Sequence, residues 1–334
     1  MKLSILDQAR ITSGNTAVQA LKNAEELAML ADELGYHRMW MAEHHGMDVV
    51  ASSAPEITIA HLAAKTKNLR VGTGGTMVMH YSPLKLAEVF KTLSAYAPNR
   101  IDFGVGRAPG GDGNAIYAMS EGKEPQMHNM YEKIEQALQY MKDEVPAKSP
   151  YNKTIAMPSQ IALPEAWLLG SSGNSAIQAG RMGIGYSFAQ FFNGSMTHDI
   201  LDSYRNNFKP SAFLEKPNIL VTYMVTVAET KEEAEFEGLP YDISQLWLMR
   251  GMIKPSLTPE EAQTYPLSEI ERMQIREFRK RQLHFVGDVQ EVSAQLRKEQ
   301  AIYGFDEAML MTVPHSQEKR LNSYRLLAKE LLDK

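Results

Sequence analysis

Residues 38–48 read RMWMAEHHGMD, a short apolar run that stops abruptly at polar side chains. The apolar part predicts a buried strand over 38–42. Glu43, His44 and His45 follow at its end. Because a neutral imidazole can donate and accept a proton near pH 7, this strand end is a candidate site of chemistry. A histidine pair after a strand is also typical of a hydrogen-bonded loop, so the choice depends on the rest of the chain.

The composition excludes several kinds of site. Of 334 residues, 44% are hydrophobic and 22% charged, which is typical of a globular protein. The chain has no cysteine, so disulfides, thiolate metal sites and cysteine nucleophiles are excluded. A net charge of -5 with mixed signs lacks the basic face that nucleic acid requires. No apolar run approaches the roughly 18 residues of a membrane helix, and MKLSILDQAR is too polar for a signal peptide, so we expect a cytoplasmic protein without a membrane partner.

Short apolar runs alternate with amphipathic helical stretches along the chain. The runs predict eight strands, at 3–6, 38–42, 69–73, 101–105, 166–169, 185–188, 218–227 and 307–312. Apolar residues at helical spacing predict helices over 18–34, 55–64, 83–93, 131–141, 175–182, 270–281 and at the C-terminus. Asn15 is expected to cap the first helix and Gly35 to end it. Eight strands, nearly all followed by a helix, favour an α/β fold of the (β/α)₈ TIM-barrel class.

An open doubly wound sheet is the alternative to a barrel. No glycine-rich GxGxxG turn follows a strand near the N-terminus, which disfavours it. Two stretches, about 106–126 and 236–284, interrupt the alternation and are expected to be insertions at the C-terminal face that act as lids or binding loops. We therefore expect a single domain over 1–334.

Four unusual segments each follow a predicted strand, namely 43–45, 74–77, 104–111 and 170–175. In a barrel, the carboxyl ends of the strands share one face, and chemistry is located there. We therefore expect the four segments to surround one site.

The last of these segments, GSSGNS, has the chemistry of an anion site. The cofactor-binding candidates are Gly170, Ser171, Ser172 and Ser175. Glycines allow close backbone approach, serines donate hydrogen bonds, and the start of the following helix carries free N–H groups and a positive dipole. Simple capping of that helix is the alternative, but a cap needs one such residue rather than three. Phosphate is favoured, with Arg107 as a second ligand because its guanidinium is planar and always charged.

Gly74 and Gly75 are interpreted as a surface for a flat ligand, where a side chain would collide with it. A flexible turn is the alternative. Met77, Met79 and Phe188 are candidates for the apolar walls of that site, and each is as readily explained as ordinary core.

No metal centre is expected. His44 and His45 are adjacent, so their side chains diverge in an extended chain, and no other His, Asp and Glu spacing is typical of metal ligands. His80 is expected to be a hydrogen-bonded loop histidine.

Taken in order, these segments resemble the bacterial luciferase-like, flavin-dependent monooxygenase family. The matching stretches are AEHHG at 42–46, VGTGGTMVMHYSPLKLAE at 71–88, RIDFGVGRAPGG at 100–111, LLGSSGNSAIQAGRMGIGY at 168–186 and HFVGDVQEVSAQLRKE at 284–299. Together they extend over nearly the whole chain.

The resemblance implies a dimeric (β/α)₈ barrel that binds FMN. The FMN phosphate would lie at Ser171, Ser172 and Ser175 with Arg107 nearby. The ring would lie over Gly74–Gly75, where members of this family often have a cis peptide bond that does not precede proline.

The resemblance also implies that His44 is the catalytic histidine, with Glu43 and His45 as its neighbours. Light-emitting members have a reactive cysteine before the arginine, whereas here Gly106 precedes Arg107. The chain is therefore closer to the non-luminous members.

The implied activity is that of an FMN-dependent monooxygenase. A separate flavin reductase would supply reduced FMN, and reaction with O₂ would give a flavin hydroperoxide that oxygenates a small organic substrate. The protein would be a homodimer. A deazaflavin-dependent hydride transferase and a flavin-binding protein without catalysis are the alternatives. A sugar-phosphate lyase or isomerase would need a lysine or paired carboxylates at strand ends, and none is found there.

Overall fold

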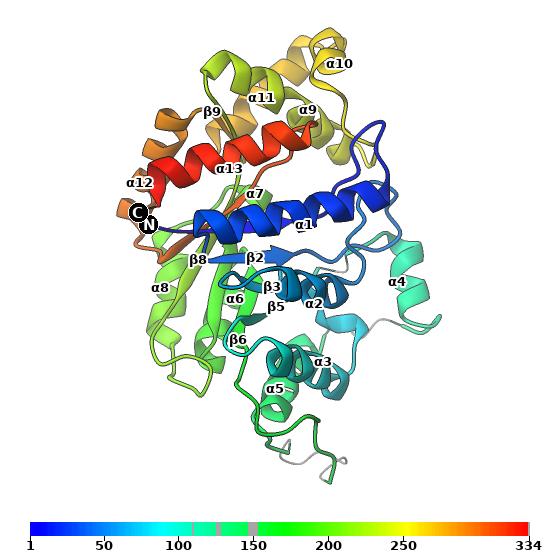
Figure 1. Ribbon diagram of the computed structural model, residues 1–334, viewed down its shortest axis with the longest axis vertical. Coiled ribbons are helices and arrows are strands. Elements are labelled where there is room, and N and C mark those ends of the chain that lie inside the picture. Colours follow the sequence, from blue (N-terminus) through cyan, green and yellow to red (C-terminus); the bar gives the residue numbers. More distant parts are fainter. Residues whose placement is uncertain (109, 125–127, 146–152, 333–334) are drawn as a thin grey trace.

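The computed structural model describes residues 1–108, 110–124, 128–145 and 153–332 (Figure 1). Eight parallel strands close into a barrel, in the order β1 (Lys2–Asp7), β2 (Arg38–Met41), β3 (Arg70–Thr73), β5 (Ile101–Gly106), β6 (Glu165–Gly170), β7 (Gly185–Ala189), β8 (Ile219–Ala228) and β10 (Glu307–Met311). Strand β10 closes the ring because it pairs with both β8 and β1. The predicted (β/α)₈ barrel and all eight of its strands are confirmed, whereas the single domain over 1–334 stays a prediction.

Two further strands extend the barrel wall. The first is β4 (Thr76–Met77), which pairs with the end of β5. The second is β9 (Phe285–Asp288), which pairs with the last residues of β8. Neither strand was predicted from the sequence: β4 because a run of two residues shows no strand period, and β9 because it directly follows the stretch 236–284 that was interpreted as an insertion.

Helices cover the outside of the barrel. They are α1 (Ala17–Leu34), α2 (Pro55–Lys65), α3 (Pro83–Tyr96), α5 (Met130–Met141), α6 (Gly173–Met182), α8 (His198–Asn207), α12 (Val289–Tyr303) and α13 (Gln317–Leu331), with a 3₁₀ turn, η1 (Val78–His80). In Figure 1, α1 and α13 lie side by side, and they contact each other. Helix α1 ends at Gly35 in the left-handed conformation, as predicted, but its cap is Thr16 rather than Asn15, since the Thr16 hydroxyl accepts from the Gln19 N–H.

Both predicted insertions contain helices. The stretch 106–126 includes α4 (Gly113–Met119). The stretch 236–284 includes most of α9 (Lys231–Met249), followed by α10 (Pro259–Thr264) and α11 (Glu269–Lys280), and a short α7 (Gln190–Asn193) follows β7. Figure 1 shows α9, α10 and α11 gathered at one end of the molecule. No helix among the described residues is long and apolar enough to span a bilayer.

The apolar core has two layers. The inner layer fills the barrel and consists of Leu6, Trp40, Ala42, Trp167, Leu220, Met224, Met309 and Met311, together with Tyr241 from α9. The outer layer lies between the strands and the helices. Met79 and Phe188 belong to the outer layer, so of their two interpretations the structure supports ordinary core.

The amino ends of the strands carry a buried ionic network. Arg38 is 1% exposed and donates to Asp102 at 2.7 Å and to Glu307 at 2.8 Å. Arg70 and the Trp40 indole also donate to Asp102. Burial works against ionisation of Asp102, but Arg38 and Arg70 hold its pKa below the ordinary value. This network lies at the end of the barrel opposite to the four predicted site segments.

Candidate functional site

Glu43 holds the loop after β2 in place. Its carboxylate is fully buried and accepts from the Met77 N–H at 2.8 Å and the Tyr81 hydroxyl at 2.7 Å. It also lies 2.7 Å from Nε2 of His45. Because both oxygens are engaged inside the protein, Glu43 positions neighbouring groups and does not face a ligand.

His44 differs from its two neighbours. Its backbone N–H donates to the Ser52 carbonyl at 2.9 Å, which fixes the loop. Its Nδ1 is buried, with no hydrogen-bond partner among the described residues. Burial, the charge of Arg10 and the nearby His45 lower the pKa of His44 to about 4. The ring is therefore neutral near pH 7, with a ring nitrogen left for an external partner.

His45 belongs to the support of the loop. Its side chain is 13% exposed and hydrogen-bonded to Glu43, and its ring meets that of His80 edge-on at 5.7 Å between centroids. Its backbone N–H donates to the Gly110 carbonyl at 2.6 Å. Of the three residues predicted as catalytic, the geometry leaves only His44 with an unsatisfied buried atom.

The peptide bond between Gly74 and Gly75 is cis, as the resemblance implied. A Cβ on Gly74 would lie 2.6 Å from Cδ1 of Leu6, and one on Gly75 would lie 3.1 Å from the Gly104 carbonyl oxygen. Contacts inside the protein thus explain why neither residue has a side chain. The interpretation of these glycines as a surface for a flat ligand stays a prediction.

Met77 supports the loop after β5. It is buried, and a Cβ on Gly110 would lie 3.1 Å from its side chain. A Cβ on Gly111 would lie 2.7 Å from the His45 carbonyl oxygen. The glycines therefore let this loop lie directly on Met77 and on the His44–His45 segment.

The GSSGNS segment separates into two parts. Ser172 is exposed and precedes α6, and no side chain caps this helix. Ser171 is partly buried. The Ser175 hydroxyl turns inward, where it donates to the Ser172 carbonyl at 2.8 Å and lies 3.2 Å from the Tyr186 hydroxyl. A Cβ on Gly170 would lie 2.1 Å from the Ser175 hydroxyl, so this glycine makes room for Ser175. The predicted alternative of side-chain capping is thus absent from α6.

Arg107 lies beside this helix start. It is exposed and follows β5, the neighbour of β6 in the ring. Burial raises the pKa of Tyr131, and the charge of Arg107 opposes that rise. The Asn174 amide on α6 donates to the Tyr131 hydroxyl at 3.1 Å. Arg107 and the start of α6 are therefore on the same side of the barrel mouth. Tyr131 and Asn174 were not predicted as site residues, because nothing in their own segments links them.

The family model described as luciferase-like monooxygenase matches residues 1–307. The chain belongs to this family. It is 35% identical over 336 residues to the N-acetyl-S-alkylcysteine monooxygenase of Bacillus subtilis, covering 99% of this chain and 98% of the relative. It is 25% identical to the oxygenase component of the flavin-dependent trigonelline monooxygenase of Acinetobacter baylyi, over 89% of this chain and 85% of the relative. The crystal structure of apo-MsnO8 matches with a TM-score of 0.88 and 34% identity, covering 100% of this chain and 99% of the other.

Family membership makes the protein a monooxygenase by class, an enzyme that incorporates oxygen from O₂. The segments after β2, β3, β5 and β6 follow four consecutive strands of the ring, so they lie at the same end of the barrel along one half of its mouth. That they form one site stays a prediction. Among the described residues, no group of three His, Asp or Glu side chains could hold a metal ion.

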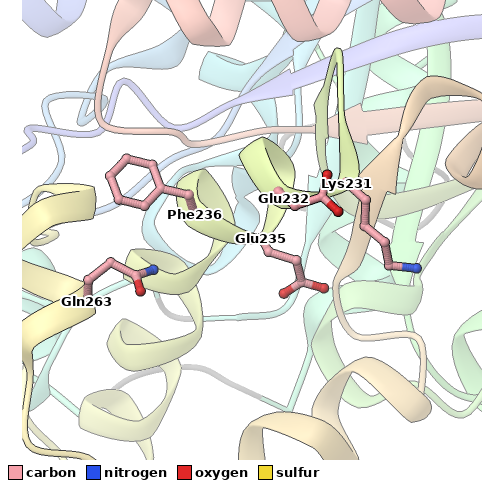
Figure 2. A pocket seen from close by; sticks show the side chains of 5 residues that line it. All are labelled: Lys231, Glu232, Glu235, Phe236 and Gln263. Carbon is pink, nitrogen blue, oxygen red and sulfur yellow. The ribbon is translucent and has the colours of Figure 1, made fainter.

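A hollow elsewhere on the surface is not this site. Figure 2 shows a depression of about 390 Å³ near the start of α9, lined by Lys231, Glu232, Glu235, Phe236 and Gln263. Four of these residues lie on α9, which begins after the carboxyl end of β8, and Gln263 lies on α10. Among the described residues, none of the predicted site residues lines this hollow. The chemistry of this luciferase-like monooxygenase is therefore sought at the mouth.

The lowered pKa of His44 should make stability depend on pH. The unfolded chain has a histidine pKa near 6.5 and the folded one a pKa of about 4, so the unfolded state binds more protons between these values. Stability from this group is complete above pH 6.5 and falls as the pH falls towards 4, by up to about 3 kcal/mol. We expect the difference in unfolding free energy between wild type and His44→Asn to change by about this amount between pH 7 and 4, measured by urea unfolding. A constant difference would contradict the burial of His44.

Proposed function

We propose that the protein is an FMN-dependent monooxygenase that uses reduced FMN and O₂ to oxygenate a small organic substrate. The observation that carries the proposal is His44, neutral and with an unpartnered buried nitrogen, at the same barrel mouth as the uncapped start of α6 and Arg107. A proton-handling group and an anion-binding group thus lie on the two sides of one opening.

The residues present fit the phosphate end of FMN. The first N–H groups of α6 have no side-chain cap, and such groups bind phosphate well. Ser171 and Ser172 precede this helix, and Arg107 follows the neighbouring strand β5; these three residues are the proposed ligands. Ser175 keeps the turn in shape through its buried hydroxyl. The cis Gly74–Gly75 segment is the proposed wall for the ring, with Met77 beneath the adjoining loop.

When bound and reduced, FMN supplies the electrons that activate O₂. The role of His44 is to hold or transfer a proton at its ring nitrogen beside the reacting oxygen. Glu43 and His45 keep that ring in place through the hydrogen bonds after β2. The apolar side chains inside the barrel, Tyr241 among them, exclude water from the reacting atoms.

Two partners belong to the same proposal. A separate flavin reductase would deliver reduced FMN, in line with a relative that is named as an oxygenase component. A second copy of the chain would complete a homodimer.

Arg107→Gln should weaken FMN binding about 10- to 100-fold, because a charge-assisted hydrogen bond is worth about 1.5–3 kcal/mol. The matched control is Arg181→Gln, which removes an exposed arginine from the last turn of α6. It should leave FMN affinity unchanged. The measurement is an anaerobic fluorescence titration with reduced FMN, repeated with a reduced deazaflavin.

This titration, together with turnover under labelled O₂, tests the whole proposal. Wild type should bind reduced FMN in preference to the deazaflavin, and ¹⁸O from labelled O₂ should appear in the organic product. Preference for the deazaflavin, or a product free of ¹⁸O, would refute the monooxygenase assignment.

A further inference from the structure

We propose that Arg10 recognises a carboxylate group of the organic substrate. This inference rests on the proposed function, because it assigns a substrate class to the same barrel mouth. It starts from a charged side chain that has no partner among the residues that the structure describes.

The backbone around Arg10 is rigidly held beside the catalytic loop. Arg10 follows β1 and forms an antiparallel bridge with Val50. The N–H of Ile11 donates to Val49, and the N–H of Ala51 donates to Ala9, both at 2.9 Å. The 49–51 segment continues directly to Ser52, whose carbonyl accepts from the His44 N–H. Arg10 and His44 therefore share one small hydrogen-bonded unit at the mouth.

The guanidinium of Arg10 has no ion pair or hydrogen bond with any residue in the described ranges. It is partly buried, and burial lowers its pKa, opposed only by Tyr241. The acidic residue nearest along the chain, Asp7, is already paired with Arg320 at 2.8 Å. An arginine keeps its charge even when buried. A partly buried charge without a counter-ion is costly, so an anion from outside the chain would stabilise this site.

Arg38 and Arg320 show how this protein treats arginines that are buried. Each has a carboxylate within 2.8 Å. Arg10 has the same chemistry and lacks that carboxylate. The missing partner is what a substrate carboxylate would provide, with two parallel hydrogen bonds to the planar guanidinium.

The position of Arg10 excludes the FMN phosphate as its ligand. Around the ring the strands run β1, β2, β3, β5, β6, β7, β8 and β10. Strand β1 therefore lies opposite β6, whose end carries the phosphate site. Strand β2, which carries His44, is adjacent to β1. Arg10 is thus on the reacting side of the mouth, away from the phosphate side.

The surroundings of Arg10 indicate the rest of the substrate. Tyr241 interacts electrostatically with Arg10 and belongs to the apolar cluster inside the barrel. Three partly buried apolar side chains pack on that cluster, from Leu169, Phe191 and Val313. If the substrate carboxylate bound Arg10, the remainder of the substrate would lie against these apolar side chains. The inferred class is a small organic acid with an apolar part.

The test compares matched probes that differ only in charge. The probes are N-acetyl-S-methylcysteine, 3-(methylthio)propionate, hexanoate and benzoate, each beside its primary amide. Binding to wild type, Arg10→Gln and Arg10→Lys is measured by isothermal titration, with and without oxidised FMN. Wild type should bind at least one acid tenfold or more tightly than its amide. Arg10→Gln should reduce that preference to within twofold, and Arg10→Lys should retain part of it, while amide affinity stays constant.

Arg107→Gln serves as the reciprocal control. It should lower FMN affinity and keep the preference for acids. Arg10→Gln should keep FMN affinity and lose the preference for acids. Acid and amide binding that do not differ in wild type would overturn the proposal, as would a preference that survives in Arg10→Gln. A loss of reduced-FMN affinity in Arg10→Gln would also overturn it, because the charge would then serve the flavin ring. If wild type prefers acids but binds no FMN, the proposed function fails while the assignment of Arg10 stands.

Discussion

Replacing His44 with asparagine should lower turnover by about 10²- to 10⁴-fold, the usual contribution of a positioned general acid or base. The buried Nδ1 of His44 has no partner among the described residues, and the ring is neutral near pH 7 because its pKa is about 4. Asparagine keeps a polar group of similar reach but cannot exchange a proton. The measurement is product formation with reduced FMN, using the best substrate found among the acid and thioether probes.

The control for His44→Asn is His61→Gln. His61 lies on α2, is 51% exposed and is hydrogen-bonded to Glu25, so its replacement should leave turnover unchanged. FMN affinity in His44→Asn should stay within about twofold of wild type, since the proposed phosphate site follows β6 on the other side of the mouth. Turnover within threefold of wild type would exclude His44 as the proton-handling residue. A parallel loss of FMN affinity would instead assign it to binding.

The barrel was predictable because its strands are buried on both faces and so form continuous apolar runs. The 3–6 and 307–312 runs, for example, match β1 and β10 to within one residue at each end. Helix α9 was missed because Pro240 lies inside it, and a proline within a helical pattern normally indicates an interruption.

The site could be predicted only where its residues are close together in the sequence. The segment after β2 was found because Glu43, His44 and His45 are consecutive. The convergence of Arg10, His44 and Tyr241 was not found, because these residues come from three separate elements and none lies in a pattern that refers to the others. The separate roles of neighbouring residues within a motif could not be predicted either, because they depend on partners far away in the sequence. Glu43, for example, accepts from the Tyr81 hydroxyl.

The buried ionic network at the amino ends of the strands should contribute strongly to the stability of the fold. Arg38→Met should destabilise the fold by about 3–5 kcal/mol, the usual cost of removing one partner from a buried ion pair. Asp102 and Glu307, both at most 1% exposed, would lose the guanidinium that neutralises them. The measurement is urea unfolding at pH 7, monitored by tryptophan fluorescence. The Arg38 guanidinium lies 4.8 Å from the Trp167 ring centroid, so this signal reports on the network.

The matched control separates burial from charge. Arg70→Met removes an arginine that also pairs with Asp102 but is 14% exposed, so water can replace part of the lost interaction and the destabilisation should be smaller. Arg38→Lys keeps the charge but loses the planar geometry that serves Asp102 and Glu307 together, and should be intermediate. Equal effects of Arg38→Met and Arg70→Met would show that burial does not set the cost. Because the network lies at the amino ends of the strands, residual folded Arg38→Met protein should bind FMN normally, which distinguishes lost stability from a damaged site.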